Sequence, residues 1–207
     1  MGAFDLNLLS YIWILDTAAM RATWYSFPAL KDDNLFFSTC VNRGDNWVLN
    51  YYAYNRKNGT LVWNYRDESI WGDMVALSPT TLFSLNLRLL DYLAPAIWRD
   101  TVIYTSGDSV VRAFNSRSGT LKWIRHFDFA TSSAPTIAGD RIYFGLRGDD
   151  LSPYGQKPRL ICLSARNGKK LWEMELEGNL LSAPVIAGKW LIFGTDANMF
   201  YVLEELY

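Results

Sequence analysis

Three stretches of the chain repeat one pattern of about a dozen residues, and this repetition constrains the fold more than any other feature. They are residues 52–63 (YAYNRKNGTLVW), 112–123 (RAFNSRSGTLKW) and 161–172 (ICLSARNGKKLW). The pattern predicts two short strands joined by a tight turn, in which a glycine supplies positive φ. In each stretch a small residue stands six positions before the glycine and a tryptophan four after it: Ala53, Gly59 and Trp63; Ala113, Gly119 and Trp123; Cys162, Gly168 and Trp172.

We expect each tryptophan of the pattern to pack as a wedge between neighbouring sheets, because one indole recurs at the same place in every copy. A degenerate fourth copy is assigned to residues 13–24 (WILDTAAMRATW). There Ile14 and Met20 replace the small residue and the glycine, and Trp24 takes the tryptophan position.

A second pattern is in register with the first. It has a proline, a short apolar run, a polar turn and an aromatic-rich strand, and it occurs at residues 26–37, 93–104, 133–144 and 182–193. Proline is tolerated at the first residue of a strand, where its missing N–H costs no ladder bond. The two patterns together predict a four-stranded antiparallel meander, which is a propeller blade. The predicted fold class is therefore all-β, a β-propeller of about four blades.

Taken together, these residues resemble the pyrroloquinoline-quinone-type (PQQ-like) repeat β-propellers. The resemblance covers most of residues 26–65 and 91–207, is weak in 1–25 and is missing from 66–90. It implies blades of four antiparallel strands. It also implies a periplasmic or cell-envelope location, which is frequent in that family.

The predicted organisation is a single propeller domain over residues 1–207. Its parts are a degenerate partial blade (1–25), a blade (26–65), an insertion (66–90), two blades (91–125 and 126–175) and a last blade without its final strand (176–207). We expect residues 22–27 to pair beside residues 199–204 and to close a small ring. The alternative is an open arc, cut from a larger propeller or paired with a second copy.

Two Arg-Gly-Asp triplets, at residues 43–45 and 147–149, invite comparison with cell-adhesion ligands. However, a Gly-Asp or Thr-Asp pair ends the second strand of every unit, and the arginine precedes it in only two of the four. We therefore interpret the triplets as Gly/Asp turns and not as an adhesion motif.

Strand direction alternates in a meander, so the connections of the blades lie on two opposite faces. The short turns fall on one face, and the longer segments 41–47, 66–90 and 146–159 fall on the other. Long loops on a rigid scaffold commonly carry binding. Trp71 has no place in the repeat, so we interpret it as a plug of the channel, with a pocket wall as the alternative. The candidate interaction residues are Arg43, Asp45, Trp71, Arg147, Asp149 and Tyr154.

Composition excludes several classes of function. The chain has 20 basic and 21 acidic residues, so it lacks the excess of positive charge on which nucleic-acid binding depends. Its two cysteines and single histidine are not spaced as metal ligands. The vicinal cysteines that mark quinoprotein dehydrogenases do not occur, so we expect no cofactor, no metal site and no enzymatic activity.

Membrane insertion is not expected, because no apolar run approaches the length of a span. The apolar run at residues 6–15 follows Asp5 and has no basic residue before it, so we interpret it as a strand and not as a signal peptide. The chain is expected to be soluble.

The function that the sequence favours is a non-catalytic scaffold that binds an unidentified protein partner through the face bearing segments 41–47, 66–90 and 146–159. It would then be similar in kind to the propeller lipoprotein of the outer-membrane barrel-assembly machinery. The alternative is a cofactor- or carbohydrate-binding propeller, or a degenerate quinoprotein dehydrogenase fragment. An open arc would also allow a homo-oligomer.

Overall fold

A computed structural model describes residues 2–15, 24–43, 46–67, 93–148 and 155–204. Every regular element in these ranges is a β-strand, which confirms the predicted all-β class. Among the described residues, no helix with the length and apolarity of a membrane span is found.

The strands form five antiparallel sheets that follow one another along the chain. The N-terminal hairpin comprises β1 (Gly2–Asp5) and β2 (Ser10–Ile14). Blade 1 comprises β3 (Trp24–Tyr25), β4 (Ala29–Lys31), β5 (Asn34–Arg43), β6 (Asn46–Asn55) and β7 (Leu61–Asp67). Blade 2 comprises β8 (Ala96–Trp98), β9 (Thr101–Thr105), β10 (Val110–Asn115) and β11 (Leu121–His126). Blade 3 comprises β12 (Thr136–Ala138), β13 (Arg141–Leu146), β14 (Arg159–Ser164) and β15 (Lys170–Glu175). The end sheet comprises β16 (Val185–Ala187), β17 (Trp190–Gly194) and β18 (Phe200–Glu204).

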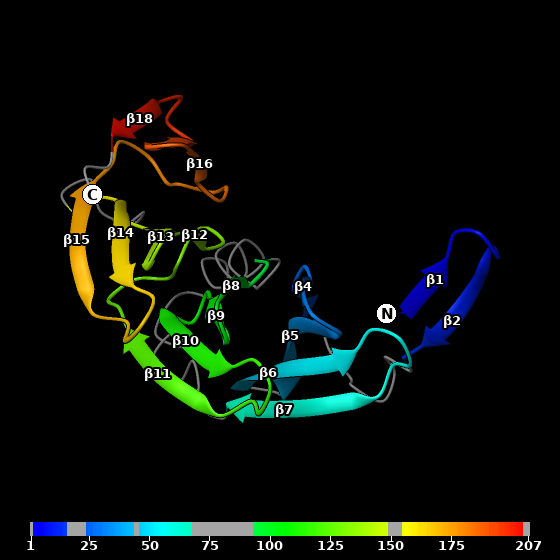
Figure 1. The fold of residues 1–207 in the computed structure, drawn as a ribbon. Coiled ribbons are helices and arrows are strands. Elements are labelled where there is room, and N and C mark those ends of the chain that lie inside the picture. The colour runs from blue at the N-terminus through cyan, green and yellow to red at the C-terminus, as the bar shows by residue number, and fades with distance from the viewer. Residues whose placement is uncertain (1, 16–23, 44–45, 68–92, 149–154, 205–207) are drawn as a thin grey trace.

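The sheets are arranged as an open arc (Figure 1). The N-terminal hairpin lies at one end and the end sheet at the other, with open space between them. The chain therefore has the architecture of a β-propeller in its open form.

The predicted ring closure through residues 22–27 is wrong. Trp24 and Tyr25 pair with Cys40 and Thr39 of β5 and so belong to the first strand of blade 1. That strand continues as β4, which also pairs with β5. Pro28 separates the two pieces because it has no N–H to offer to the ladder.

The three repeated stretches fold into hairpins of identical register. Ala53 lies opposite Trp63, Ala113 opposite Trp123, and Cys162 opposite Trp172. A bulge follows the small residue in all three hairpins. The intervening glycines Gly59, Gly119 and Gly168 have φ between 66° and 72°, as the turn requires.

The N-terminal hairpin is the true fourth copy, and the assignment to residues 13–24 is corrected. Ala3 lies opposite Trp13, and the same bulge follows Ala3. Leu9 takes the glycine position with a φ of 50°. A leucine in this left-handed region is strained. The repeat pattern required glycine at this position, so it did not identify the N-terminal copy.

Trp13, Trp63 and Trp123 lie directly on the glycine turn of the following blade, whereas Trp172 is partly exposed and packs at the rim of the cluster between blade 3 and the end sheet. A Cβ atom on Gly59 would be 2.8 Å from Cδ2 of Trp13, and one on Gly119 would be 2.6 Å from Cδ2 of Trp63. On Gly168 it would be 2.6 Å from Cε3 of Trp123. Glycine is therefore required at these turns for the close approach of the indole as well as for its φ.

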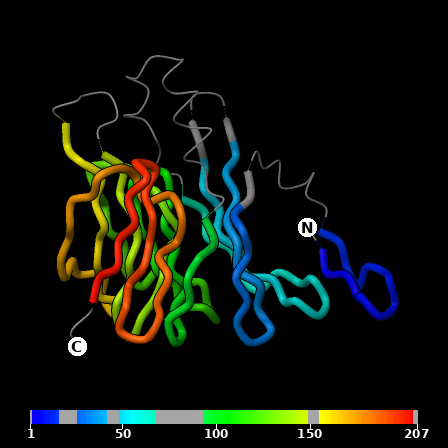
Figure 2. The backbone as a smooth tube through the Cα atoms, turned by 90° about the horizontal axis from the view of Figure 1, so that it is seen from above, coloured from blue at the N-terminus to red at the C-terminus, as the bar shows by residue number. Residues whose placement is uncertain are grey.

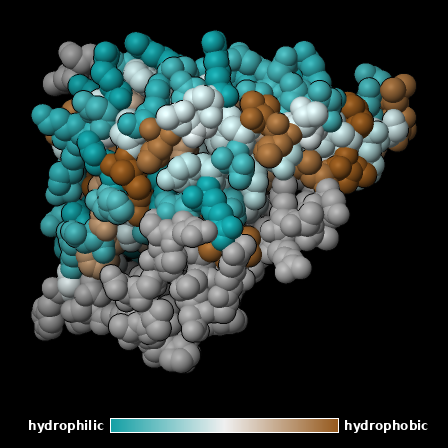
Figure 3. All heavy atoms as spheres, turned by 90° about the horizontal axis from the view of Figure 1, so that it is seen from below, coloured by the Kyte–Doolittle hydropathy of each residue, from teal (hydrophilic) through white to brown (hydrophobic). Residues whose placement is uncertain are grey.

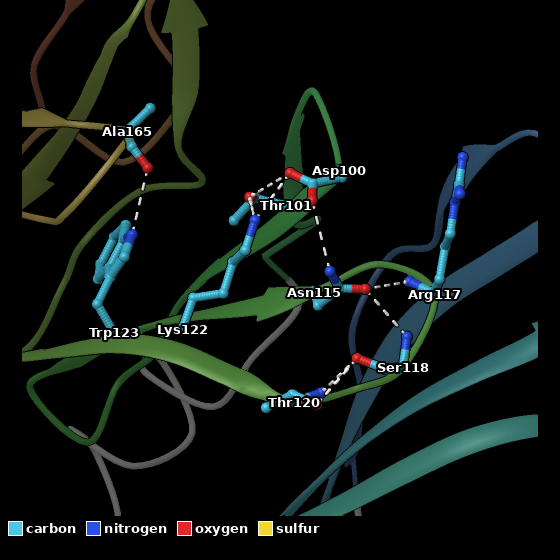
Figure 4. Close-up of polar contacts among 9 residues, drawn as sticks. All are labelled: Asp100, Thr101, Asn115, Arg117, Ser118, Thr120, Lys122, Trp123 and Ala165. Atoms are coloured by element: carbon cyan, nitrogen blue, oxygen red, sulfur yellow. Dashed lines mark hydrogen bonds and ion pairs between the residues drawn. The ribbon is translucent and has the colours of Figure 1, made fainter.

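The indole N–H groups complete the junctions. Nε1 of Trp13, Trp63 and Trp123 donates to the backbone oxygen of Arg56, Ser116 and Ala165, at 2.7, 3.0 and 3.2 Å respectively. Figure 4 shows the bond from Trp123 to Ala165. Three apolar clusters fill the spaces between blades 1 and 2, blades 2 and 3, and blade 3 and the end sheet.

Candidate interaction face

The blades present two different edges. The loop face, as we name it, is the edge where β5, β7, β9 and β13 end and β6, β10 and β14 begin. The turn face is the opposite edge, which carries the tight turns after β4, β6, β8, β10, β12 and β14.

A two-stranded ribbon extends from the loop face. β5 and β6 contain ten residues each, whereas β9, β10, β13 and β14 contain five or six. The register continues to the end of the ribbon, where Val41 lies opposite Val48 and Arg43 opposite Asn46. Figure 2 shows β5 and β6 running side by side toward this edge of the molecule.

Two of the six candidate interaction residues lie in the described part of the chain. Arg43 is the last residue of β5, at the end of the ribbon. Arg147 follows β13 and is only 8% exposed, and its backbone N–H donates to Ala130 O at 2.9 Å. Arg147 is therefore largely inaccessible to a partner at the loop face. Asp45, Trp71, Asp149 and Tyr154 lie outside the described residues.

A buried charged cluster beneath the loop face was not foreseen from the sequence. Arg112 of β10 is fully buried, and its Nε donates to Oδ2 of Asp67 at 2.7 Å. Its two terminal nitrogens donate to the carboxylate of Asp108 at 3.1 and 2.6 Å. The cluster therefore joins the end of β7 in blade 1 to the turn between β9 and β10 in blade 2.

The guanidinium of Arg112 is held firmly in its charged form. Burial opposes the charge, but Tyr51, Asp108 and Asp67 outweigh it and raise the pKa of Arg112 above its ordinary value. The guanidinium also lies over the ring of Tyr51, 5.6 Å from the ring centroid.

The turn face is closed by local hydrogen bonds and ion pairs. In blade 2, Lys122 Nζ lies 2.7 Å from Oδ1 of Asp100, and the side-chain oxygen of Asn115 accepts from two backbone N–H groups of its own turn (Figure 4). Equivalent ion pairs join Asp33 to Lys57 at 2.9 Å and Asp140 to Arg166 at 3.0 Å. These groups are therefore paired within the chain.

The ion pairs of the turn face predict a small loss of stability in acid. Hydrogen bonds from Lys57, Lys122 and Arg166 lower the pKa values of Asp33, Asp100 and Asp140 below their ordinary 3.8. A lowered pKa in the folded state contributes stability that is present above about pH 4 and is lost as the pH falls through the folded value. These groups are exposed, so the effect is small.

Urea unfolding of the native chain and of Asp140→Asn at pH 7 and pH 3 checks this prediction. The difference between the free energies of unfolding of the two proteins should narrow at pH 3, because the carboxyl of Asp140 then binds a proton more readily in the unfolded chain than in the folded one. An equal difference in the free energy of unfolding between the two proteins at both pH values would contradict this prediction.

Over the ranges that the structure describes, no three side chains of His, Cys, Asp or Glu lie close enough together to hold a metal ion. Among the described residues, the loop face gathers the Arg112 cluster, the ion pair of Lys157 with Glu177 and the hydrogen bonds of Asn179 with Asp196.

Comparisons with known proteins place this geometry in a family. A family model described as outer membrane protein assembly factor BamB matches residues 12–153 and 148–206. No curated protein matches.

Solved propellers share the fold. The computationally designed Ika4 protein is 10% identical with a TM-score of 0.60, and the match covers 87% of this chain and 91% of Ika4. Quinohemoprotein alcohol dehydrogenase from Comamonas testosteroni is 13% identical with a TM-score of 0.58, over 86% of this chain and 32% of the enzyme. The Neurospora crassa Pan2 WD40 domain is 13% identical with a TM-score of 0.55, over 87% of this chain and 46% of that chain.

The chain thus spans less than half of each of these two natural proteins, and at such identities the likeness shows the fold alone. The family model covers nearly the whole chain, including the repeats whose wedge and glycine positions are described above. The chain therefore belongs to the PQQ-like repeat propeller family whose model is described as outer membrane protein assembly factor BamB.

Proposed function

We propose that this chain is a non-catalytic scaffold that binds a protein partner through its loop face. The observation that carries the proposal is the ribbon of β5 and β6, which projects from that face with Arg43 and Asn46 at its end. Residues at the end of a strand pair that rigid blades hold in place are well positioned to bind a partner.

The Arg112 cluster supports the proposal because it stiffens the base of this face. It fixes the end of β7 against the neighbouring blade through two carboxylates. A preorganised surface loses less conformational entropy when it binds.

The family description points in the same direction, since an assembly factor acts on other proteins. We expect the partner to be a component of outer-membrane protein assembly. The alternative of a cofactor-binding propeller remains testable on the same protein.

A photo-crosslinking amino acid at Asn42, near the end of the ribbon, tests the proposal in the native host. We expect one adduct of defined mass at Asn42 and none at Arg117, an exposed residue of the turn face that serves as the control. Equal labelling at both positions, or none at either, would contradict a partner on the loop face.

The non-catalytic part of the proposal needs a separate measurement. The purified chain, mixed with pyrroloquinoline quinone and calcium and then desalted, should retain no quinone absorbance. Stoichiometric retention would favour the cofactor-binding alternative.

A further inference from the structure

Strands β17 and β18 of the end sheet carry residues in the register that every preceding blade uses to pack on the next one, although the described end sheet has no fourth strand with a tryptophan. Val202 lies opposite Ile192, in the register of Ala53 opposite Phe36, Ala113 opposite Ile103 and Cys162 opposite Tyr143. Those six residues are all fully buried in blade junctions, but Val202 is 51% exposed. We name Ile192, Phe200 and Val202 the forward face.

Phe200 shows the same contrast. It stands two residues before Val202, a position that Tyr51, Val111 and Leu160 occupy in blades 1, 2 and 3. These three residues are at most 1% exposed, each in a core cluster between blades, whereas Phe200 is 71% exposed. The forward face is therefore half of a blade junction.

The N-terminal hairpin presents part of the other half of such a junction, namely the part that the last two strands of a blade supply. Phe4 pairs with Tyr11 in the register of Phe114 with Leu121, and these two residues of blade 2 pack in the cluster shared with blade 1. Phe4 is 45% exposed and Tyr11 is 63% exposed. Together with Ile14, which is 64% exposed, we name them the backward face.

Both faces are apolar, and their rings and aliphatic side chains lie open to solvent. Figure 3 shows hydrophobic residues gathered at the hairpin end of the molecule, on the right of the view. In the interior of the arc, a forward face always packs on a backward face. The two ends of one copy lie on opposite sides of the open space, so they do not meet each other (Figure 1).

We infer that a second copy of this chain covers these faces, so that two arcs associate head to tail and close one ring. The forward face of each copy packs on the backward face of the other. The contact repeats the strand register of the blade junctions within the chain. A two-fold axis relates the two copies, so the same contact forms at both places where their ends meet. The inference does not depend on the proposed function, because the loop face remains free.

Sedimentation equilibrium of the purified 207-residue chain over a hundredfold range of concentration tests the inference. The expected result is reversible formation of a dimer and no larger species. A monomer at every concentration would overturn the inference and leave the rest of a longer protein as the occupant of the faces. Polymers of increasing mass would also overturn it, because a head-to-tail contact that does not close gives filaments.

Single substitutions identify the faces in contact. Val202→Asp on the forward face and Tyr11→Lys on the backward face should each give monomers. An equimolar mixture of the two should dimerise again, because one junction is then native and the other pairs Asp with Lys. A dimer that survives Tyr11→Lys would show a contact between two forward faces and overturn the head-to-tail arrangement.

The matched control is Leu171→Asp, on the outer strand of blade 3, where Leu171 is 45% exposed. This variant should dimerise like the native chain. Far-ultraviolet circular dichroism of every variant should match that of the native chain, which separates loss of contact from loss of fold.

Discussion

Replacing Trp123 by alanine is expected to lower the free energy of unfolding by about 3–5 kcal/mol. The indole is only 8% exposed, lies against Gly168 and donates to the carbonyl of Ala165. The substitution removes a large buried surface between blades 2 and 3 and leaves that carbonyl without its donor. Urea unfolding followed by circular dichroism measures the loss.

Trp172→Ala provides the matched control. Trp172 has the same place in its hairpin but is partly exposed and packs at the rim of the cluster against the end sheet. Its removal should therefore cost clearly less than removal of Trp123. A loss below about 1 kcal/mol for Trp123→Ala, within the range of ordinary surface substitutions, would mean that it is not a wedge.

Arg112→Leu is expected to lower the free energy of unfolding by about 3–5 kcal/mol, because it leaves two largely buried carboxylates without their guanidinium. Asp67 and Asp108 have side chains that are 8% and 5% exposed, so water does not readily replace the lost hydrogen bonds. The loss is measured by urea unfolding at neutral pH.

The comparison for Arg112 is Lys122→Leu, which removes an exposed ion pair with Asp100. Such a pair contributes about 0–1 kcal/mol. Adding Asp67→Asn and Asp108→Asn to Arg112→Leu should recover part of the loss, since neutral amides are less costly to bury. An Arg112→Leu variant as stable as Lys122→Leu would contradict the buried cluster.

The sequence predicted the blades well because the repeat encodes both register and junction. A spacing of ten residues between the small residue and the tryptophan places the two opposite each other across the hairpin. The glycine between them meets two requirements at once, its φ and the approach of the previous indole.

The N-terminal copy was misplaced for a physical reason. Ala3 and Trp13 keep the spacing of ten residues, but Leu9 replaces the glycine. Leu9 is 74% exposed, so its side chain avoids the close approach of an indole that requires glycine at residues 59, 119 and 168. Of the two requirements for glycine at this turn, only the positive φ, here 50°, is still present at Leu9.

The loop face could be located from strand direction, but its chemistry could not. Arg112 lies between Val111 and Ala113 in a strand buried on both sides, and its partner Asp67 is 45 residues away in another blade. A single sequence does not show such a pair. The burial of Arg147 was hidden for the same reason, since the Arg-Gly-Asp pattern indicates a turn without saying which way the arginine points.

Proton NMR tests the wedge junctions most directly. We expect nuclear Overhauser contacts from the indole protons of Trp13, Trp63 and Trp123 to the Hα protons of Gly59, Gly119 and Gly168, respectively. The ring currents of the indoles should also displace these glycine resonances from their usual positions. Glycine resonances at ordinary positions, or contacts from Trp24 in place of Trp13, would contradict the blade junctions on which the fold and both proposals are built.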